Sequence, residues 1–216
     1  IINQKRKPVV VAMSGGVDSS VSAALLAEEG YHVIGVTMRL LPTTQSGFGC
    51  CGAPDDIRIA RRAAHALGIP HYVVDVSKDF QHKVISYFVA SYLKGETPNP
   101  CVACNQHMKF GTLRTFAKSL GASHLATGHY ARIIPAQQSK GGKSLRLFEA
   151  RDPAKDQSYV LYMAGQQELS ETLFPVGDKT KNEIRILAKK FGLENADKKE
   201  SQEICFVPDR DYASFI

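Results

Sequence analysis

The chain has 216 residues, 44% of them hydrophobic, which is enough to bury one substantial core and to begin a second domain. It contains no apolar run long enough to cross a bilayer, and its basic start is not followed by a secretory hydrophobic region. The sequence therefore predicts a soluble protein of the cytoplasm, or of an organellar matrix, with no membrane partner. The net charge of +6 suits a polyanionic partner, although it is also typical of an ordinary solvated surface.

In chain order, short β-branched runs alternate with stretches whose apolar residues recur at helical spacing. Alternation of this kind is typical of a parallel sheet with crossover helices. The predicted fold class is therefore α/β, with a doubly wound parallel sheet. Strands are expected at residues 8–12, 32–38, 71–76 and 123–127, and helices at residues 19–29, 56–67, 80–93 and 106–120.

The later part of the chain predicts a hairpin and one further helix. Residues 132–147 enclose a glycine- and lysine-containing segment without acidic residues, which indicates a basic hairpin tip. Thr180 and Glu183 have capping-box spacing, and an apolar stripe that includes Ile184 and Ala188 follows them. We expect this helix to open a second domain, and its apolar stripe to lack partners within the chain.

A glycine- and serine-rich loop at residues 14–20 directly follows the first predicted strand and precedes the first helix. Glycine backbone and a helix N-terminus then converge on one point, which is a geometry that binds anions. The loop is neither a Walker A motif nor a dinucleotide fingerprint. It resembles the PP-loop of ATP pyrophosphatases, although a serine-capped turn would share its composition. The resemblance implies that Ser14, Gly15, Gly16, Ser19 and Ser20 hold pyrophosphate and that Asp18 helps to position magnesium.

The same resemblance implies a complete ATP site in an adenine nucleotide alpha hydrolase-like fold. Met38 and Gly128 follow two predicted strands, where a doubly wound sheet keeps its ligand crevice, and both resemble adenosine contacts. Considered alone, they would be a core methionine and a turn glycine. The expected nucleotide-binding residues are Ala12, Met13, Ser14, Gly15, Gly16, Val17, Asp18, Ser19, Met38 and Gly128.

The five cysteines, at positions 50, 51, 101, 104 and 205, include one C-x-x-C pair. Their odd number, in a chain without an export signal, indicates reactive thiols, a metal or a cluster rather than a structural disulfide framework. Cys50 and Cys51 are adjacent and cannot easily supply the tetrahedral spacing of zinc, so we assign them no role.

Several motifs together resemble the tRNA-specific 2-thiouridylase family, in that family's order and over nearly the whole chain. They are residues 97–105, 109–111, 126–132, 155–159 and 201–206. The resemblance implies an ATP-dependent tRNA uridine 2-sulfurtransferase that adenylates the C2 oxygen of the wobble uridine. Its partners would be tRNA and a sulfur-donor protein. It also implies a catalytic domain at residues 1–168, the beginning of a central domain at 169–216, and a C-terminal β-barrel that this chain lacks.

The resemblance assigns the sulfur chemistry to two cysteines. Cys104 would be the nucleophile and Cys205 would carry the persulfide, with a disulfide between them after transfer; Asp18 is the third residue placed in the catalytic set. Many relatives have Asp where this chain has Cys101. A [4Fe–4S] cluster held by Cys101, Cys104 and Cys205 is therefore the alternative sulfur mechanism.

The resemblance also places residues against the RNA. The target base would be contacted by Asn99, Pro100 and Cys101, and His129 would lie beside the reacting site. A histidine with a purely structural role would fit the same sequence position. Three further contacts to tRNA are implied at Lys155, Asp156 and Gln157. Two other functions stay open at this point: a PP-loop synthetase acting on a small metabolite, and a nucleotide-binding RNA module without catalysis.

Overall fold

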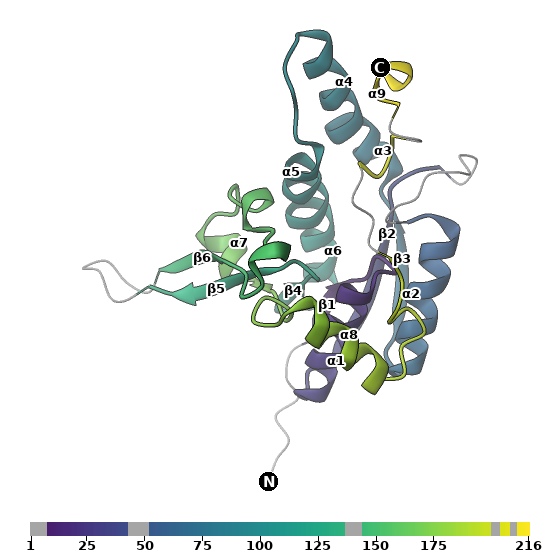
Figure 1. Ribbon diagram of the computed structural model, residues 1–216, viewed down its shortest axis with the longest axis vertical. Coiled ribbons are helices and arrows are strands. Elements are labelled where there is room, and N and C mark those ends of the chain that lie inside the picture. The colour runs from purple at the N-terminus through teal and green to yellow at the C-terminus, as the bar shows by residue number, and fades with distance from the viewer. Residues whose placement is uncertain (1–7, 43–51, 137–143, 200–203, 208–210) are drawn as a thin grey trace.

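The computed structural model describes residues 8–42, 52–136, 144–199, 204–207 and 211–216 (Figure 1). Its centre is a parallel sheet with the strand order β3-β2-β1-β4-β7. The expected parallel α/β fold is confirmed, with β1 as the middle strand. The strands are β1 (Val9–Ala12), β2 (Val33–Arg39), β3 (His71–Asp75), β4 (His124–Ala126) and β7 (Thr172–Leu173).

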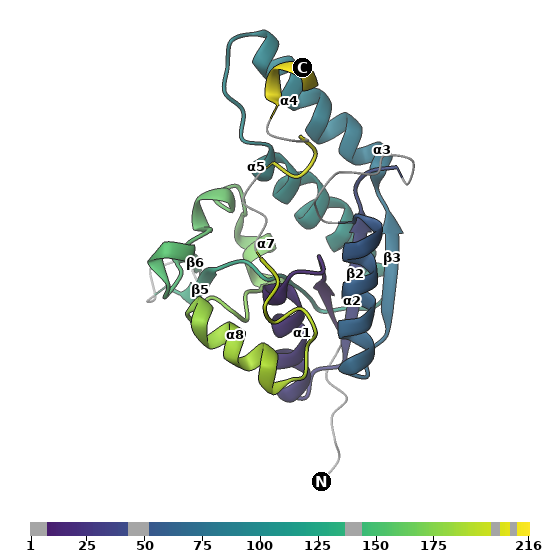
Figure 2. The same cartoon turned by 45° about the vertical axis from the view of Figure 1, so that its right-hand side comes forward.

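Helices cover both faces of the sheet, as the strand order requires. One face carries α1 (Val17–Glu28) and α2 (Pro54–Ala66), and α8 (Lys181–Lys190) packs against α1 (Figure 2). The opposite face carries two long helical segments. The first comprises α3 (Ser77–Phe80), η1 (Gln81–Ile85) and α4 (Ser86–Leu93); the second comprises α5 (Pro100–Cys104), η2 (Asn105–Leu113) and α6 (Arg114–Ser119).

The central strand explains why the core has two layers. Val9, Val10 and Val11 are all fully buried, and successive side chains of a strand point to opposite faces. Val9 and Val11 join the cluster formed with α1, α2 and α8, whereas Val10 joins the cluster under α3 to α6. An uninterrupted hydrophobic strand is therefore what a sheet covered on both faces demands.

The direction of the crossovers reverses between β1 and β4, which are neighbouring parallel strands. The chain leaves β1 for β2 and β3 on one side, and returns to β4 on the other. In an open parallel sheet, the carboxyl ends of the strands flanking such a reversal leave a crevice for ligands. The loop at residues 13–16 follows β1 and residues 127–129 follow β4, so both reach this crevice.

The second long helix differs from expectation at its start and in its middle. It begins at Pro100 rather than near residue 106. The Asn99 side chain caps this end, and the fixed φ of proline suits the first position of a helix. Residues 105–113 then form a π-helical segment, a rare conformation that is frequent at functional sites.

The hairpin is confirmed as β5 (Ala131–Pro135) paired antiparallel with β6 (Leu145–Glu149). Its expected basic tip at residues 137–143 lies outside the described residues, as do Cys50 and Cys51. The remaining short elements are η3 (Pro153–Lys155), η4 (Ser158–Val160), α7 (Gln166–Ser170) and α9 (Tyr212–Phe215). None of the helices within the described ranges is long and apolar enough to span a membrane.

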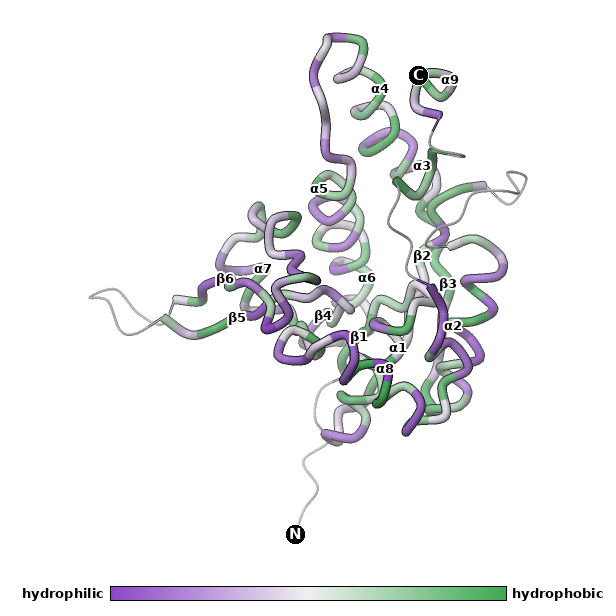
Figure 3. The backbone as a smooth tube through the Cα atoms, in the orientation of Figure 1, coloured by the Kyte–Doolittle hydropathy of each residue, from purple (hydrophilic) through white to green (hydrophobic). Residues whose placement is uncertain are grey.

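The expectation that the apolar stripe of α8 lacks partners is wrong. The helix contains both hydrophilic and hydrophobic residues (Figure 3), and Ile184 and Ala188 are fully buried in the same cluster as Val21 of α1. The capping box of Thr180 and Glu183 is confirmed. The boundary at residues 168/169 stays a prediction; in the structure, β7 extends the central sheet and α8 packs on α1.

Candidate functional site

A cavity of about 520 Å³ opens at the carboxyl ends of the central strands. Its wall combines the loop before α1, the start of the second long helix, the residues after β4, and the segment that ends near Phe206. The cavity thus brings most of the expected site residues together. Those that line it are Ala12, Met13, Ser14, Gly16, Val17, Asp18, Ser19, Met38, Pro100, Cys101, Cys104, Gly128, His129, Lys155, Gln157 and Cys205.

The loop between β1 and α1 is held open by its own serines. The amide of Ser14 donates to Ser19 Oγ at 3.2 Å, and the hydroxyls of Ser19 and Ser20 donate to the carbonyl of Gly16 at 3.0 and 3.1 Å. These bonds fix the loop against the first turn of α1, whose amide groups have no carbonyl partner within the helix. The arrangement suits an anion at the helix N-terminus.

Two glycines allow the backbone to come close around this loop. Gly15 has φ +77°, and a Cβ there would lie 2.5 Å from the carbonyl oxygen of Asp56 in α2. A Cβ on Gly128 would lie 2.7 Å from the amide nitrogen of Ser19. Gly128 therefore lets the loop after β4 touch the first turn of α1, which is a structural reason for glycine in addition to the expected adenosine contact.

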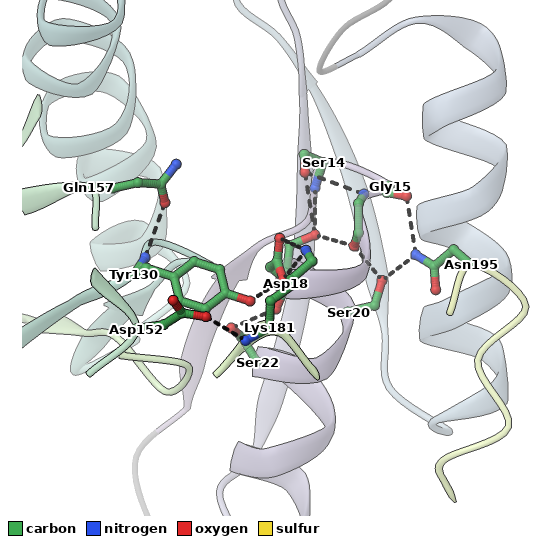
Figure 4. Close-up of polar contacts among 12 residues, drawn as sticks. Ser14, Gly15, Asp18, Ser20, Ser22, Tyr130, Asp152, Gln157, Lys181 and Asn195 are labelled. Carbon is green, nitrogen blue, oxygen red and sulfur yellow. Dashed lines mark hydrogen bonds and ion pairs between the residues drawn. The ribbon is translucent and has the colours of Figure 1, made fainter. Parts of the chain in front are cut away.

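Asp18 is the centre of a charged cluster that the sequence does not predict (Figure 4). Both of its carboxylate oxygens accept from the ammonium of Lys181 in α8, each at 2.8 Å, and Oδ1 also accepts from the hydroxyl of Tyr130 at 2.7 Å. The side chains of Lys181 and Asp18 are only 10% and 23% exposed. In this conformation Asp18 holds a lysine and does not present an open metal ligand.

The turn after α8 forms a second support for the loop, also visible in Figure 4. The Asn195 side chain is buried, and its Nδ2 donates to the carbonyl of Gly15 at 3.1 Å and to Ser20 Oγ at 3.0 Å. Lys198 donates to the same carbonyl and pairs with Asp56. Residues 181–198 thus fasten the loop at several points before the chain continues to Cys205.

His129 is buried and bonded on both ring nitrogens. Its Nε2 lies 2.9 Å from the ammonium of Lys109, and its Nδ1 lies 2.7 Å from Thr127 Oγ1. Since an ammonium only donates, Nε2 must accept, and the ring proton therefore resides on Nδ1 and is donated to Thr127. Burial, and then the charge of Lys109, lower the pKa of His129 well below its ordinary value, so the ring is neutral.

Three cysteines, Cys101, Cys104 and Cys205, line the cavity. Cys101 is exposed, whereas Cys104 and Cys205 are half-buried and pack against the same hydrophobic cluster. Phe206, directly after Cys205, packs edge to face with Phe88 and so anchors this end of the chain. Within the described ranges, no three Cys, His, Asp or Glu side chains gather closely enough to hold a metal ion, so the residues do not present a ready cluster site.

Four expected residues, Gly15, Ser20, Asn99 and Asp156, do not line the cavity, and each has a structural task. The hydroxyl of Ser20 donates to the carbonyl of Gly16 and accepts from Asn195. The carbonyl of Gly15 receives Asn195, and Asn99 Oδ1 accepts from the amide of Cys101 at 3.0 Å. Asp156 accepts from the amide of Ala150 at 2.9 Å and from Ser158, and so fixes the turn that carries Lys155 and Gln157. Gln157 Oε1 accepts from the amide of Tyr130 at 3.1 Å.

Sequence reasoning missed the residues that support the site from elsewhere in the chain. Lys109 and Tyr130 stand inside motifs that carry the family resemblance, which was an available signal. Lys181 is the first residue of an ordinary amphipathic helix and Asn195 lies in the turn after that helix, and nothing local marks either residue. Only the packing of α8 on α1 brings them to the loop before α1.

The doubly wound sheet, with a serine- and glycine-lined loop at its switch point, defines a nucleotide-binding domain of the PP-loop type. The fold is similar to the structure of NMN synthetase from Francisella tularensis, with a TM-score of 0.52 and 16% identity over 92% of this chain and 67% of that chain. A family model described as the tRNA methyl transferase HUP domain matches residues 7–209.

The chain belongs to the tRNA-specific 2-thiouridylase family. It is 54% identical over 220 residues to the tRNA-specific 2-thiouridylase MnmA of Geotalea uraniireducens (strain Rf4), a match that covers 99% of this chain and 58% of that protein. The MnmA of Geobacter metallireducens is 52% identical over 218 residues, with 98% and 58% covered. The chain thus spans 58% of the length of these relatives.

Proposed function

We propose that this chain carries the ATP site and the sulfur-transferring cysteines of a tRNA uridine 2-sulfurtransferase. One observation carries the proposal: a phosphate-binding loop and two half-buried thiols, Cys104 and Cys205, line the same cavity although they come from distant parts of the chain. A synthetase acting on a small metabolite would need the loop but would have no use for the paired thiols. The family relationship supports the same choice.

The first step activates the base. The C2 oxygen of the target uridine attacks the α-phosphorus of ATP, the bond to the β-phosphate oxygen breaks, and pyrophosphate leaves with the electron pair. The N3 proton of the uridine is lost to solvent. In this scheme Ser14, Ser19 and the first turn of α1 hold pyrophosphate, and Met38 and Gly128 contact the adenosine. This step turns the C2 oxygen, which is a poor leaving group, into part of an adenylate, and the positioning of the two reactants lowers its barrier.

The second step exchanges oxygen for sulfur. The terminal sulfur of a persulfide on Cys205 attacks C2, and AMP leaves. The thiolate of Cys104 then attacks the Cys205 sulfur and breaks the sulfur–sulfur bond, which leaves 2-thiouridine and a disulfide between the two cysteines. A reductant must restore the thiols, and a sulfur-donor protein must reload Cys205.

The tRNA is expected at the exposed side of the cavity, near Cys101 and Lys155. A wobble base belongs to a single-stranded loop and can be turned out of its stack into a pocket. Lys155 would meet phosphate, Gln157 would meet a base edge, and Asn99, Pro100 and Asp156 would shape the two loops that carry these contacts. His129 would lie beside the reacting base.

Two inorganic groups belong to this proposal in different ways. Magnesium in nucleotide sites is held mainly by substrate phosphates and one or two carboxylates. Asp18 is the expected protein ligand, but its oxygens hold Lys181, so we derive no step through the ion. A [4Fe–4S] cluster on Cys101, Cys104 and Cys205 is the alternative sulfur carrier, and the described residues do not gather as its ligands.

The test is nucleoside analysis of tRNA incubated with the full-length protein, ATP and a persulfide donor. We expect 2-thiouridine together with stoichiometric AMP and pyrophosphate. Absence of 2-thiouridine under conditions in which the donor is active would overturn the proposal. Binding of tRNA without ATP turnover would instead indicate an RNA module without catalysis, and ATP turnover stimulated by a small metabolite would indicate a synthetase.

A further inference from the structure

We propose that Lys109 contacts the α-phosphate of the bound nucleotide, and that neutral His129 holds its ammonium in place for this contact. The inference rests on the proposed function, because it requires a nucleotide in the cavity. It adds a phosphate ligand that does not belong to the loop before α1.

The first argument is the fixed position of the Lys109 ammonium. His129 is 7% exposed and accepts from Lys109 through Nε2, while its Nδ1 proton is donated to Thr127, which is 2% exposed. The ring also packs edge to face on Phe174, at 6.0 Å between centroids. A buried, neutral and doubly bonded imidazole cannot turn without losing both bonds, so it restricts a lysine head group that would otherwise be mobile.

The second argument is where this position lies. Gly128, the neighbour of His129, approaches the amide of Ser19 so closely that no Cβ fits between them. His129 follows Gly128 directly, and both His129 and Lys109 lie on the wall of the cavity that the first turn of α1 also lines. Lys109 also follows Cys104 by five residues in the segment where the backbone changes to π-helical bonding. Lys109 thus lines the same cavity as the loop before α1 and as Cys104.

The third argument is charge. Two other lysines near the loop are paired with carboxylates, Lys181 with Asp18 and Lys198 with Asp56. Among the described residues, no carboxylate lies within ion-pair distance of Lys109, and its bonded partner His129 is neutral. A half-buried ammonium without a counter-charge at a cavity wall favours an anionic ligand.

The contact has a defined role in the reaction proposed above. As the uridine oxygen bonds to the α-phosphorus and pyrophosphate leaves, negative charge stays on the non-bridging oxygens of the α-phosphate. The same group carries the charge again when AMP departs from C2. A fixed ammonium stabilises both states electrostatically and keeps its own protons throughout.

The experiment compares AMP with adenosine, which differ only in the α-phosphate. Calorimetry on the full-length protein measures both affinities in wild type, Lys109→Gln, Lys109→Met and Lys109→Arg. The Gln variant keeps a donor toward His129 without the charge. We expect the Gln and Met variants to bind AMP about tenfold more weakly with adenosine binding unchanged, and the Arg variant to recover part of the loss. Lys83→Met, at an exposed lysine paired with Asp79, is the matched control and should change neither affinity.

The outcomes separate this inference from the proposed function. Wild-type protein that binds AMP no better than adenosine would overturn both. Wild type that prefers AMP, together with a folded Lys109→Gln variant that retains the full preference, would overturn the role of Lys109 alone. If the Met variant does not fold, the Gln and Arg variants decide the question, with thermal melting as the check on folding.

Discussion

The ammonium of Lys181 lies 2.8 Å from each carboxylate oxygen of Asp18, although the two residues are 163 positions apart in the chain. The pair fastens α8 to the first turn of α1, directly after the loop at residues 13–16. Tyr130 donates to the same carboxylate from the loop after β4. Three separate parts of the chain therefore meet on one side chain, and the loop geometry depends on all of them.

We expect Lys181→Met to lower the free energy of unfolding by about 2 kcal/mol, between the values typical of exposed and of buried pairs, because it leaves Asp18 partly buried without a cation. Urea unfolding followed by circular dichroism measures the change. Lys189→Met is the matched control, since its pair with Asp197 is exposed, and we expect a change below about 0.5 kcal/mol. The double variant with Asp18→Asn should cost less than the sum of the single changes. Equal stability of Lys181→Met and the control would contradict the structure.

Gly128→Ala should separate the loop after β4 from α1. The added methyl group would lie 2.7 Å from the amide nitrogen of Ser19, and a backbone atom cannot move aside as a flexible side chain can. We expect a loss of about 1–3 kcal/mol of stability, in the range of overpacking substitutions, and weaker ATP binding. Thermal melting and nucleotide titration measure the two effects. Gly111→Ala, whose Cβ would lie 3.3 Å from the carbonyl oxygen of Gln106, should cost less stability than Gly128→Ala; a similar loss in both variants would contradict the close approach of Gly128 to Ser19.

Stability should fall on acidification because of His129. Its pKa in the folded protein lies well below the ordinary value of 6.5, chiefly through burial. The unfolded chain therefore takes up a proton as the pH drops below about 6.5 while the folded state does not, so unfolding is favoured by up to about 1.4 kcal/mol per pH unit. His71 and His124 have lowered pKa values too and act in the same direction. The contribution of His129 is therefore the difference between the pH dependence of stability in wild type and that in His129→Gln. The variant should show a flatter dependence of melting temperature on pH between pH 5 and 8. Parallel curves would speak against a neutral His129.

Three cysteine substitutions distinguish the two sulfur mechanisms. If a persulfide operates, Cys104→Ser and Cys205→Ser should each abolish thiolation, while Cys101→Asp should be tolerated because the persulfide route uses only Cys104 and Cys205. If a cluster operates, each of the three changes should remove both iron and activity. Iron and acid-labile sulfide per chain, with turnover, are measured in protein prepared without oxygen. Activity that rises in proportion to bound iron would reject the persulfide route.

The parts of the site that the sequence could predict are those encoded locally. The phosphate loop needs only a strand, a few small residues and a helix in succession, so the run from Val9 to Val21 predicts it. The hairpin and the capping box at Thr180 are equally local. The partner of Asp18 could not be predicted in this way, because Lys181 reaches it only through the packing of α8 on α1. For the same reason the stripe of Ile184 and Ala188 was expected to be uncovered and is buried.

Residue roles were harder to predict than residue positions. Pro100 and Cys101 of the motif around Asn99 line the cavity, but the Asn99 side chain caps α5, and that of Asp156 fixes a turn. A polar residue in a motif can bind a ligand or can hold the backbone that does, and composition does not distinguish the two. The neutral state of His129 likewise depends on burial and on Lys109, neither of which is local.

The π-helical segment at residues 105–113 makes the relation between Cys104 and Lys109 depend on chain length. In an α-helix each residue advances by about 100°, so two residues five apart would point about 140° away from each other. A π-helical turn contains more residues than an α-helical turn, so the side chains of Cys104 and Lys109 come to the same side of the helix, where both line the cavity. Deletion of a single residue within the segment, even one facing solvent, would change its phase. The thiol and the ammonium would then no longer share a wall, although every side chain in contact with the cavity had been retained.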